Sequence, residues 1–392
     1  MQPLNYVDKV NNLKHSVLQM IQERNSNFQQ TDGQFPSPIW IEGLSLFDYI
    51  INLSAENFLN IRFHAGYITG SYVLEYWHQH PPADPERVAN NIGYRFYTED
   101  IPEAYWISEP PTPKLPRPLG IDYKGRIINQ DISRYQSCIY NLYSMGILTW
   151  LLEGASKNLI VEIGAGYGGL AHHLGTILAQ SSTYIILDLP EMLLFSGGYL
   201  IVNNPEKNIY VYDKSTFTPQ FLSSKIYDYD YVLLPNYVLK DLYAVREINL
   251  IVNMQSFQEM TRAQIAEYAR FGHSKLSGYI YSDNIDSHPS NSALAPDTVT
   301  TLLAKDFRLF PPPQLYDKVM GKDSPWFYKR YIGVVSDKHT LLPEEATMKF
   351  ASGFVRYTVT TGRDRLQLKA ERLWLSRLIL FGLKVLQVVF KL

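Results

Sequence analysis

Two acidic residues and a cluster of glycines in the middle of the chain have the types and spacing for binding a nucleotide. Glu162 precedes Gly164 by two positions, more glycines follow, and Asp188 comes after them. Glycines let the backbone turn sharply with no side chain between it and a ligand, and free backbone N–H groups can meet an anionic group. A carboxylate near the turn suits a cationic group, and Asp188 can accept hydrogen bonds from both hydroxyls of a ribose.

The segments around these residues have the periodicity of a βαβ unit. Residues 159–163 form a short apolar, β-branched run that is typical of a buried parallel strand. After the glycines, Leu170, Leu174 and Leu178 recur at helical spacing. Residues 184–187 form a second apolar strand. Because ligands of such units bind at the carboxyl ends of the strands, the sequence predicts a nucleotide-type site there.

The glycine pattern fits two classes of nucleotide-binding protein. Gly164, Gly166 and Gly169 satisfy the G-x-G-x-x-G spacing of dinucleotide-binding proteins, a pattern of low specificity by itself. Glu162 lies inside the strand, where dinucleotide binders usually keep an apolar residue. Glu-x-Gly-x-Gly-x-Gly instead resembles the first motif of S-adenosylmethionine-dependent methyltransferases, which favours S-adenosylmethionine as cofactor. An NAD-dependent oxidoreductase and a glycine-rich turn without ligand are the alternatives.

Five predicted strands alternate with helices along the chain. They cover residues 159–163, 184–187, 229–234, 248–252 and 279–282. The alternation predicts an α/β fold with a doubly wound parallel sheet. Residues 307–310 and 327–335 add two strands with no clear helix between them. We therefore expect a Rossmann-like class I methyltransferase sheet, mostly parallel, of seven strands with the last one antiparallel. Residues 208–212 fit either a short strand or a hairpin.

Three regions are expected along the chain. Residues 1–150 form a mainly helical N-terminal region, residues 151–340 the cofactor-binding domain, and residues 341–392 a C-terminal extension. Helical spacing in the first region covers residues 5–30, 45–77 and 126–150. Between them, five prolines crowd into residues 110–118, which excludes a helix or a central strand. This proline-rich loop is a candidate lid or acceptor site.

The C-terminal extension is expected to carry a basic amphipathic helix. Residues 373–392 are apolar around most of the helix circumference, but Arg377 and Lys384 interrupt the run. The run is therefore short of the about 20 uninterrupted apolar residues that a membrane-spanning helix needs. Three interpretations stay open: a helix on an anionic membrane surface, a helix docked on a partner or sister subunit, and a helix packed on its own domain.

Composition narrows the compartment and the partners. A net charge of −2 gives no reason to expect a nucleic-acid partner. The single cysteine, Cys138, cannot form an internal disulfide and indicates a reducing compartment. The start of the chain lacks the basic stretch followed by an apolar one that marks a secretion signal. We expect a cytoplasmic protein, with peripheral contact to the inner face of the membrane as one option for the C-terminal helix.

Three motifs resemble the bacterial sugar O-methyltransferase family. They are Val-Glu-Ile-Gly-Ala-Gly-Tyr-Gly-Gly-Leu-Ala at 161–171, Asp-Leu-Pro-Glu at 188–191 and Asn-Met-Gln-Ser-Phe-Gln-Glu-Met at 253–260. The resemblance extends from about Arg134 to Asn284, is weaker over residues 1–120 and is absent from the C-terminal tail. It implies a class I methyltransferase fold, S-adenosylmethionine as donor, and a hydroxyl of a glycan or glycosylated precursor as acceptor, as in polysaccharide biosynthesis.

The resemblance also implies which residues form the site. Those expected at the cofactor are Glu162, Gly164, Ala165, Gly166, Tyr167, Gly168, Asp188, Leu189, Asn236 and Asn253. Those expected at the acceptor are Arg134, Tyr135, Ser256 and Asn284. Arg134 precedes the first strand by one helix, and an arginine on a solvated helix face is the alternative reading of that residue.

Two acids are candidates for catalysis. A sugar hydroxyl is a poor nucleophile at neutral pH, so a general base would help. Glu259 follows the fourth strand, where several O-methyltransferases carry their catalytic residue, and Asp283 follows the fifth. The alternative for Glu259 is that it begins a helix and its charge interacts favourably with the dipole at the helix N-terminus. The alternative for Asp283 is that it forms a turn with its neighbour. No His/Cys/Asp cluster has metal-ligand spacing, so no metal is expected.

Two further functions compete with sugar methylation. A phenolic or polyketide-like acceptor is one, because Asp-Leu-Pro also occurs in such O-methyltransferases. Those enzymes usually place a histidine after the fourth strand, where this chain has Gln255 and Ser256, and this favours the sugar. A non-catalytic, membrane-associated scaffold that keeps the fold without turnover is the other.

Overall fold

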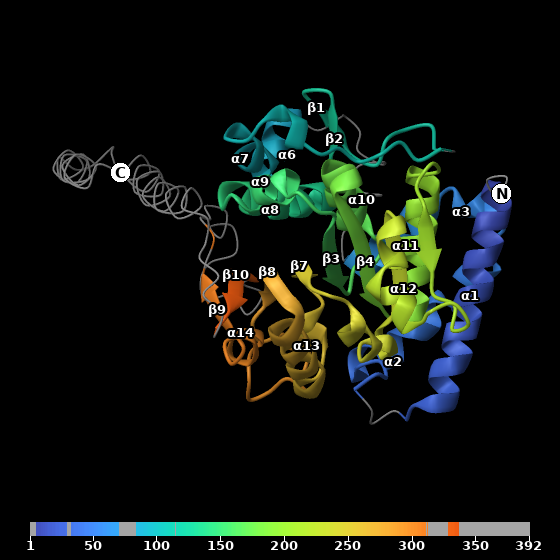
Figure 1. The fold of residues 1–392 in the computed structure, drawn as a ribbon. Coiled ribbons are helices and arrows are strands. Elements are labelled where there is room, and N and C mark those ends of the chain that lie inside the picture. The colour runs from blue at the N-terminus through green and yellow to red at the C-terminus, as the bar shows by residue number, and fades with distance from the viewer. Residues whose placement is uncertain are drawn as a thin grey trace, which may run out of the picture.

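The computed structural model describes residues 5–29, 33–69, 84–113, 115–310, 312 and 328–336 (Figure 1). An eight-stranded sheet in the order β5-β6-β4-β3-β7-β8-β10-β9 forms its centre. The strands are β3 (Asn158–Ile163), β4 (Ser182–Asp188), β5 (Ile209–Val211), β6 (Tyr231–Pro235), β7 (Ile248–Met254), β8 (Leu276–Ile285), β9 (Phe307–Phe310) and β10 (Tyr328–Val335).

Helices precede the sheet and connect its strands. They are α1 (Tyr6–Asn27), α2 (Pro38–Leu44), α3 (Ala55–Phe58), α4 (Gly66–Thr69), α6 (Pro85–Asn91), α7 (Tyr94–Glu99), α8 (Gln130–Ser144), α9 (Ile147–Glu153), α10 (Gly169–Leu178), α11 (Pro190–Asn203), α12 (Pro219–Ser223), α13 (Arg262–Lys275) and α14 (Val299–Leu303). Of these, α10 packs on β4, α11 on β4 and β6, and α13 on β8.

The strand order is that of class I methyltransferases, and it confirms the predicted fold. β3 lies at the middle, parallel to β4 on one side and to β7 on the other. The last strand, β10, runs antiparallel to both β8 and β9, as the predicted final hairpin requires. The sheet has one strand more than the seven expected, because β5 adds to the edge parallel to β6. Three residues are too few for the sequence to distinguish that strand from a hairpin.

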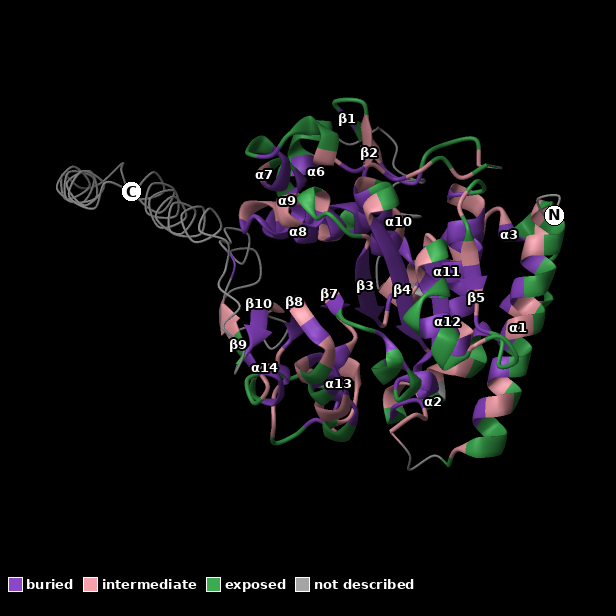
Figure 2. Ribbon diagram, in the orientation of Figure 1, coloured by how far each residue is buried: buried purple, intermediate pink, exposed green. Residues whose placement is uncertain are grey.

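The central strands are buried throughout. Every residue of β3, β4 and β6 is buried, and Figure 2 shows β3 and β4 in the interior of the molecule. Parallel strands with both faces covered read as continuous apolar runs, and this is why their positions were predictable. Glu162 and Asp188 are the acidic residues in β3 and β4, so burial sets them apart from ordinary surface acids.

The N-terminal helix packs directly on the sheet domain. α1 buries Val10, Leu13 and Val17 on one face and lies along α11. At the contact, a Cβ added to Gly197 of α11 would lie 2.7 Å from a methyl carbon of Leu13. The glycine therefore lets the two helices approach closely, and any larger residue there would push α1 away from the sheet.

One prediction for the N-terminal region needs correction. The mostly helical stretch expected over 45–77 consists, as far as residue 69, of short α and 3₁₀ helices, with Ser54 as the N-cap of α3; residues 70–77 lie outside the described residues. The start of the stretch expected over 126–150 is instead a hairpin of β1 (Ile121–Tyr123) and β2 (Arg126–Ile128). Its loop residues, Lys124 and Gly125, both have positive φ, as a two-residue hairpin turn requires.

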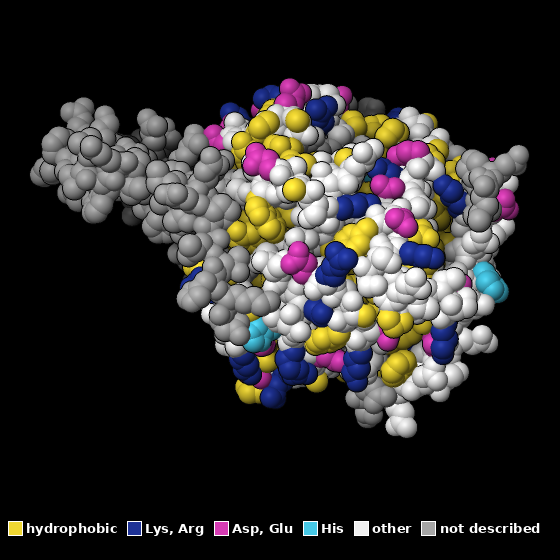
Figure 3. All heavy atoms as spheres, in the orientation of Figure 1, with side chains coloured by type: hydrophobic (Ala, Val, Ile, Leu, Met, Phe, Trp, Pro, Cys, Tyr) yellow, Lys and Arg dark blue, Asp and Glu magenta, His cyan; other side chains and the backbone are white. Residues whose placement is uncertain are grey.

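The surface charge and the helices were compared with the predictions on partners and membrane contact. Acidic and basic side chains are interspersed on the face seen in Figure 3. Across the described ranges, no helix combines the length and apolarity needed to cross a bilayer. The predicted basic helix over 373–392 lies outside the described residues.

Candidate active site

A cavity of about 310 Å³ lies at the carboxyl ends of β3, β4, β6 and β7. It brings together most of the residues predicted for the site. Those in its lining are Arg134, Tyr135, Glu162, Gly164, Ala165, Gly166, Asp188, Leu189, Asn236, Ser256 and Glu259. The lining therefore combines the glycine turn, three acids and residues from α8.

The glycine turn after β3 can hold no larger residue at its first position. Gly164 has φ +72°, and a Cβ there would lie 2.4 Å from the Cβ of Ser256. The hydroxyl of Ser256 donates to the carbonyl oxygen of Ile163 over 2.9 Å, which ties the segment after β7 to the end of β3. The two strand ends are thus fixed against each other where the cavity begins.

Asp188 is held by the turn that it faces. Its Oδ2 accepts from the backbone N–H of Gly166 over 3.0 Å, and its Oδ1 accepts from the N–H of Leu189 over 2.7 Å. Burial raises the pKa of Asp188 to about 7, although these backbone hydrogen bonds favour the charged form. Each carboxylate oxygen can accept a second hydrogen bond, so the residue can still bind a pair of hydroxyls.

Glu162 is a second buried acid in the same cavity. It is 2% exposed, and the Tyr184 hydroxyl donates to its Oε2 over 2.9 Å. Its pKa is raised to about 8, mainly by burial and in smaller part by the charge of Asp188, while the Tyr184 hydrogen bond acts in the opposite direction. Two carboxyl groups that disfavour each other's ionisation are suited to a ligand that brings positive charge.

Glu259 completes the acidic lining. It ends a 3₁₀ turn (Phe257–Glu259) after β7, and the indole Nε1 of Trp40 donates to its Oε2 over 3.0 Å. The pKa of Glu259 is raised to about 7, mainly by burial. The Trp40 hydrogen bond lowers this pKa, and the charge of Asp188 contributes to the rise. A carboxyl group with a pKa near neutrality can accept a proton from a substrate hydroxyl.

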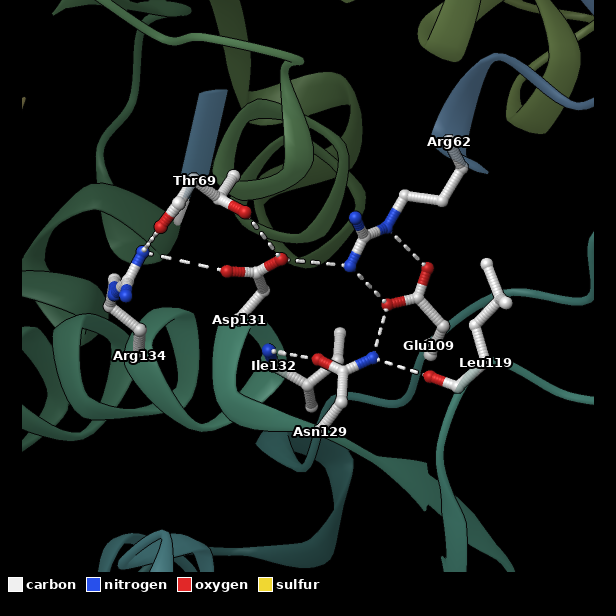
Figure 4. A network of polar contacts seen from close by, with 8 residues as sticks. All are labelled: Arg62, Thr69, Glu109, Leu119, Asn129, Asp131, Ile132 and Arg134. Atoms are coloured by element: carbon white, nitrogen blue, oxygen red, sulfur yellow. Dashed lines mark hydrogen bonds and ion pairs between the residues drawn. The ribbon is translucent and has the colours of Figure 1, made fainter. Parts of the chain in front are cut away.

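A buried polar network positions the helix that brings Arg134 and Tyr135 to the cavity. Figure 4 shows the guanidinium of Arg62 between Glu109 and Asp131, with donor–acceptor distances of 2.8 and 2.9 Å. All three of these charged residues are at most 3% exposed. Asn129 caps α8 through Ile132 N–H and donates to Glu109 over 2.7 Å. The start of α8 is therefore anchored by charges from segments far away in the sequence.

Arg134 points from this network toward the cavity. Its Nη1 donates to the carbonyl oxygen of Thr69 over 3.2 Å and lies 3.5 Å from Asp131 Oδ1 (Figure 4). Its side chain is 22% exposed, so it is not an arginine on a solvated helix face. Because Asp131 also pairs with Arg62, its negative charge compensates the positive charge of Arg134 only in part. The guanidinium of Arg134 therefore remains able to bind an anionic or polar group of a ligand.

Five predicted site residues do not line the cavity. Asp283 is the register partner of Arg330 on β10, and their side chains pair over 2.6 Å. The antiparallel hairpin therefore gives this acid a structural partner in place of the expected catalytic position. Asn253 and Asn284 are buried, and Asn284 Nδ2 donates to Asn253 Oδ1 over 2.9 Å. They stabilise the segment after β7 from behind.

The remaining two belong to the packing behind the glycine turn. The ring of Tyr167 stacks under the guanidinium of Arg62, 4.3 Å from it, and is 1% exposed. Gly168, with φ +81°, precedes the first turn of α10. Both residues therefore lie outside the lining of the cavity, and their expected contacts with the cofactor stay a prediction.

Several lining residues were not predicted from the sequence. Ser37, Trp40, Ile68 and Thr69 come from the N-terminal region, and Gln264, Tyr268 and Tyr328 come from beyond β7. Most of them carry no motif, and their contacts span up to about two hundred positions along the chain, as between Trp40 and Glu259. The proline-rich loop, expected as a lid, contributes none of the described lining residues. Among the residues described, no group of three or more His, Cys, Asp or Glu could hold a metal ion.

The chain was compared with protein families, curated proteins and solved structures. No protein-family model matches the sequence, and no curated protein matches it. Among solved structures, the chain is similar to the fibrillarin pre-rRNA processing protein of Methanococcus jannaschii, with 12% identity over 46% of this chain and 68% of that one, TM-score 0.30.

Two other similar structures are methyltransferases or biosynthetic proteins. The pyocyanin biosynthetic protein PhzM has 13% identity over 53% of this chain and 58% of its own, TM-score 0.30. The 16S rRNA methyltransferase KamB has 7% identity over 48% of this chain and 93% of its own, with a TM-score of 0.31. The fold assignment comes from the strand order of the sheet itself. That order and the glycine turn define the class I methyltransferase fold, a class that uses S-adenosylmethionine as methyl donor.

Proposed function

We propose that the protein is an S-adenosylmethionine-dependent O-methyltransferase that acts on a sugar hydroxyl of a glycan or glycosylated precursor. The observation that carries this proposal is the set of three acids, Glu162, Asp188 and Glu259, around one cavity at the strand ends. Burial raises the pKa values of all three, which disfavours their charged forms unless a cation lies beside them. A donor with a sulfonium and an ammonium group supplies that positive charge.

Glu162, Asp188 and the glycine turn would hold the donor. S-Adenosylmethionine, when bound, supplies a methyl group on a sulfonium, which is already a good leaving group. Glu162 would favour the positive end of the molecule, and Asp188 would accept from the ribose hydroxyls with the lone pairs that Gly166 and Leu189 leave free. The backbone N–H groups of the turn favour a carboxylate.

Glu259 would act as general base toward the acceptor. It lies in the cavity with Trp40 fixing one of its oxygens, so the other can accept the hydroxyl proton. The charge of Asp188 and burial keep its pKa near neutrality. Asp283, the other base candidate, is neutralised by Arg330 and is not part of this proposal.

The acceptor would occupy the part of the cavity lined by polar and aromatic side chains. Arg134, Ser256 and Gln264 offer hydrogen bonds, and Trp40 and Tyr268 offer aromatic faces against which a sugar ring can lie. The sugar also follows from the family resemblance of the motifs. Gln255 and Ser256 follow β7 at the position where enzymes for phenolic acceptors usually carry a histidine, which favours a sugar over a phenol.

Two measurements test the proposal. Calorimetric titration with S-adenosylhomocysteine and with NAD distinguishes the cofactor, and we expect binding of the first alone. Transfer of a labelled methyl group from S-adenosylmethionine to a panel of sugar and phenol acceptors then tests the substrate class. Binding of NAD in preference to S-adenosylhomocysteine would overturn the proposal, and methylation of phenols alone would overturn its acceptor.

A further inference from the structure

Three buried asparagines hold the turn that carries Glu259. They are Asn253 in β7, Asn284 in β8 and Asn291 in the loop between β8 and α14. All three are at most 6% exposed. Each forms a hydrogen bond with a different backbone group of residues 257–260. The conformation of the turn therefore depends on side chains from three separate segments.

Asn253 and Asn284 hold the first half of the turn. The Oδ1 of Asn253 accepts from the N–H of Phe257 over 3.2 Å, and the Oδ1 of Asn284 accepts from the N–H of Gln258 over 3.3 Å. The side-chain oxygen of Gln258 accepts in turn from the N–H of Ile285 over 2.7 Å. These contacts tie the turn to the carboxyl ends of β7 and β8, which pair with each other in the sheet.

Asn291 restrains the backbone on both sides of the proposed base. Its Nδ2 donates to the carbonyl oxygens of Gln258 and Met260, over 2.9 and 2.8 Å, and these residues flank Glu259. An amide nitrogen carries two N–H groups, so one is available for each carbonyl. Because a carbonyl oxygen can only accept, the nitrogen must face the turn, and the orientation of the amide is fixed.

The loop around Asn291 keeps this residue in place. Its N–H donates to the carbonyl oxygen of His288 over 2.9 Å, and its own carbonyl oxygen accepts from the N–H of Leu294 over 3.3 Å. At the start of the loop, Asp286 pairs with Lys329 of β10 over 2.6 Å. Asn291 is outside the described lining of the cavity, so it acts on the cavity through the turn that it holds.

We propose that Asn291 is a positioning residue for methyl transfer, which holds the turn so that Glu259 faces the acceptor. The carboxylate of Glu259 accepts from the indole N–H of Trp40 over 3.0 Å, and this contact requires the turn to stay in place. A reacting group misplaced by about 1 Å can cost about 10²-fold in rate. The inference rests on the proposed function and deepens it, because it assigns the orientation of the base to a loop beyond β8.

Kinetics of the full chain test the inference. Asn291→Ala should lower kcat by about 10- to 100-fold, because the base is no longer held toward the acceptor. The KM for the acceptor and the affinity for S-adenosylhomocysteine should stay within about threefold, since Asn291 does not line the cavity. Asn291→Ser, which can donate one hydrogen bond, should give an intermediate kcat and serves if the alanine variant does not fold. Wild-type kcat in either folded variant would overturn the inference.

A second buried asparagine provides the matched control. Asn158 is 4% exposed, and its Nδ2 donates to the carbonyl oxygens of Leu151 and Ser181 over 2.7 and 2.9 Å. It begins β3, at the end of the strand away from the cavity. Asn158→Ala removes the same two kinds of hydrogen bond, so it should lower the melting temperature as Asn291→Ala does and leave kcat at the wild-type value. An equal loss of kcat in the two variants would overturn the inference.

A titration followed by tryptophan fluorescence tests the inference without an acceptor. Ionisation of Glu259 beside Trp40 should give a fluorescence change with a midpoint near its pKa of about 7. Asp188 and Tyr328 also face Glu259, so the change is assigned by its loss in Glu259→Gln and in Trp40→Phe.

Asn291→Ala should move this midpoint to higher pH, because the indole N–H that favours the charged form is no longer aligned. An unshifted midpoint would overturn the inference. A shifted midpoint in a protein whose wild type transfers no methyl group would support the positioning of Glu259 and overturn the proposed function, so the two failures are distinguishable.

Discussion

Trp40 and Glu259 are joined by a 3.0 Å hydrogen bond between the indole Nε1 and the carboxylate Oε2. An indole N–H can only donate, so the contact favours the ionised carboxylate and fixes one of its oxygens. Through this contact the N-terminal region, which lies outside the sheet, determines the orientation of the proposed general base.

Glu259→Gln should lower methyl transfer by about 10²- to 10⁴-fold, the usual contribution of a general base. The affinity for S-adenosylhomocysteine should stay within about threefold, because the glutamine keeps the shape of the side chain. Transfer rates and calorimetric affinities measured on one preparation check both expectations. A variant with full transfer activity would exclude Glu259 as the base.

Trp40→Phe should move the pH dependence of methyl transfer. Loss of the N–H that favours the charged form raises the pKa of Glu259 above its value of about 7, so the acid limb of the rate profile should shift to higher pH. Trp150→Phe is the matched control, since Trp150 packs against Tyr279 and does not line the cavity. The same shift in both variants would contradict the role of Trp40.

Asp188→Ala should weaken S-adenosylhomocysteine by about 1.5–3 kcal/mol, the range for a hydrogen bond to a charged group. The loss has a second source, because Asp188 also holds the N–H of Gly166 in the glycine turn. Calorimetric titration measures the effect. Asp122→Ala is the control, because Asp122 accepts from a backbone N–H in an exposed hairpin away from the cavity. Unchanged affinity in Asp188→Ala would remove the residue from the cofactor site.

Binding of S-adenosylmethionine should strengthen as the pH rises from about 6 to about 9. The pKa values of about 8 for Glu162 and about 7 for Asp188 mean that both acids lose protons in this range. A cationic ligand favours the ionised forms, so affinity is lost as pH falls through these pKa values, and binding near neutrality releases protons. Titrations in two buffers of different ionisation enthalpy count the protons. S-Adenosylhomocysteine, which lacks the sulfonium charge, should show a shallower dependence, and equal slopes would argue against Glu162 facing the sulfonium.

Arg62→Met should destabilise the fold by about 3–5 kcal/mol, because it leaves Glu109 and Asp131 buried without their cation. Chemical denaturation gives the free energy of unfolding. Arg95→Met removes an exposed arginine that pairs with Glu99, and this control should change stability little. Equal stability of the two variants would mean that the buried network does not anchor α8.

The sequence by itself determined the central sheet and the glycine turn. β3, β4 and β6 are buried on both faces, so their sequences are mostly apolar and these strands could be predicted from the sequence. Glu162 and Asp188 lie at the carboxyl ends of β3 and β4, and Glu259 follows β7. Because the carboxyl ends of parallel strands meet at one edge of a sheet, these acids could be expected in one place. Local signals of this kind depend only on neighbours along the chain.

Only the tertiary structure decided what each strand-end residue faces. Glu259 and Asp283 are equivalent in the sequence, yet the antiparallel return of β10 pairs Asp283 with Arg330 and leaves Glu259 in the cavity with Trp40. Ser37 lies in the lining of the cavity because Asn236 and Gln264 donate hydrogen bonds to the backbone carbonyl oxygens of residues 33–35, just before it. Contacts between residues some two hundred positions apart depend on how whole elements pack, and no periodicity within one element encodes that packing.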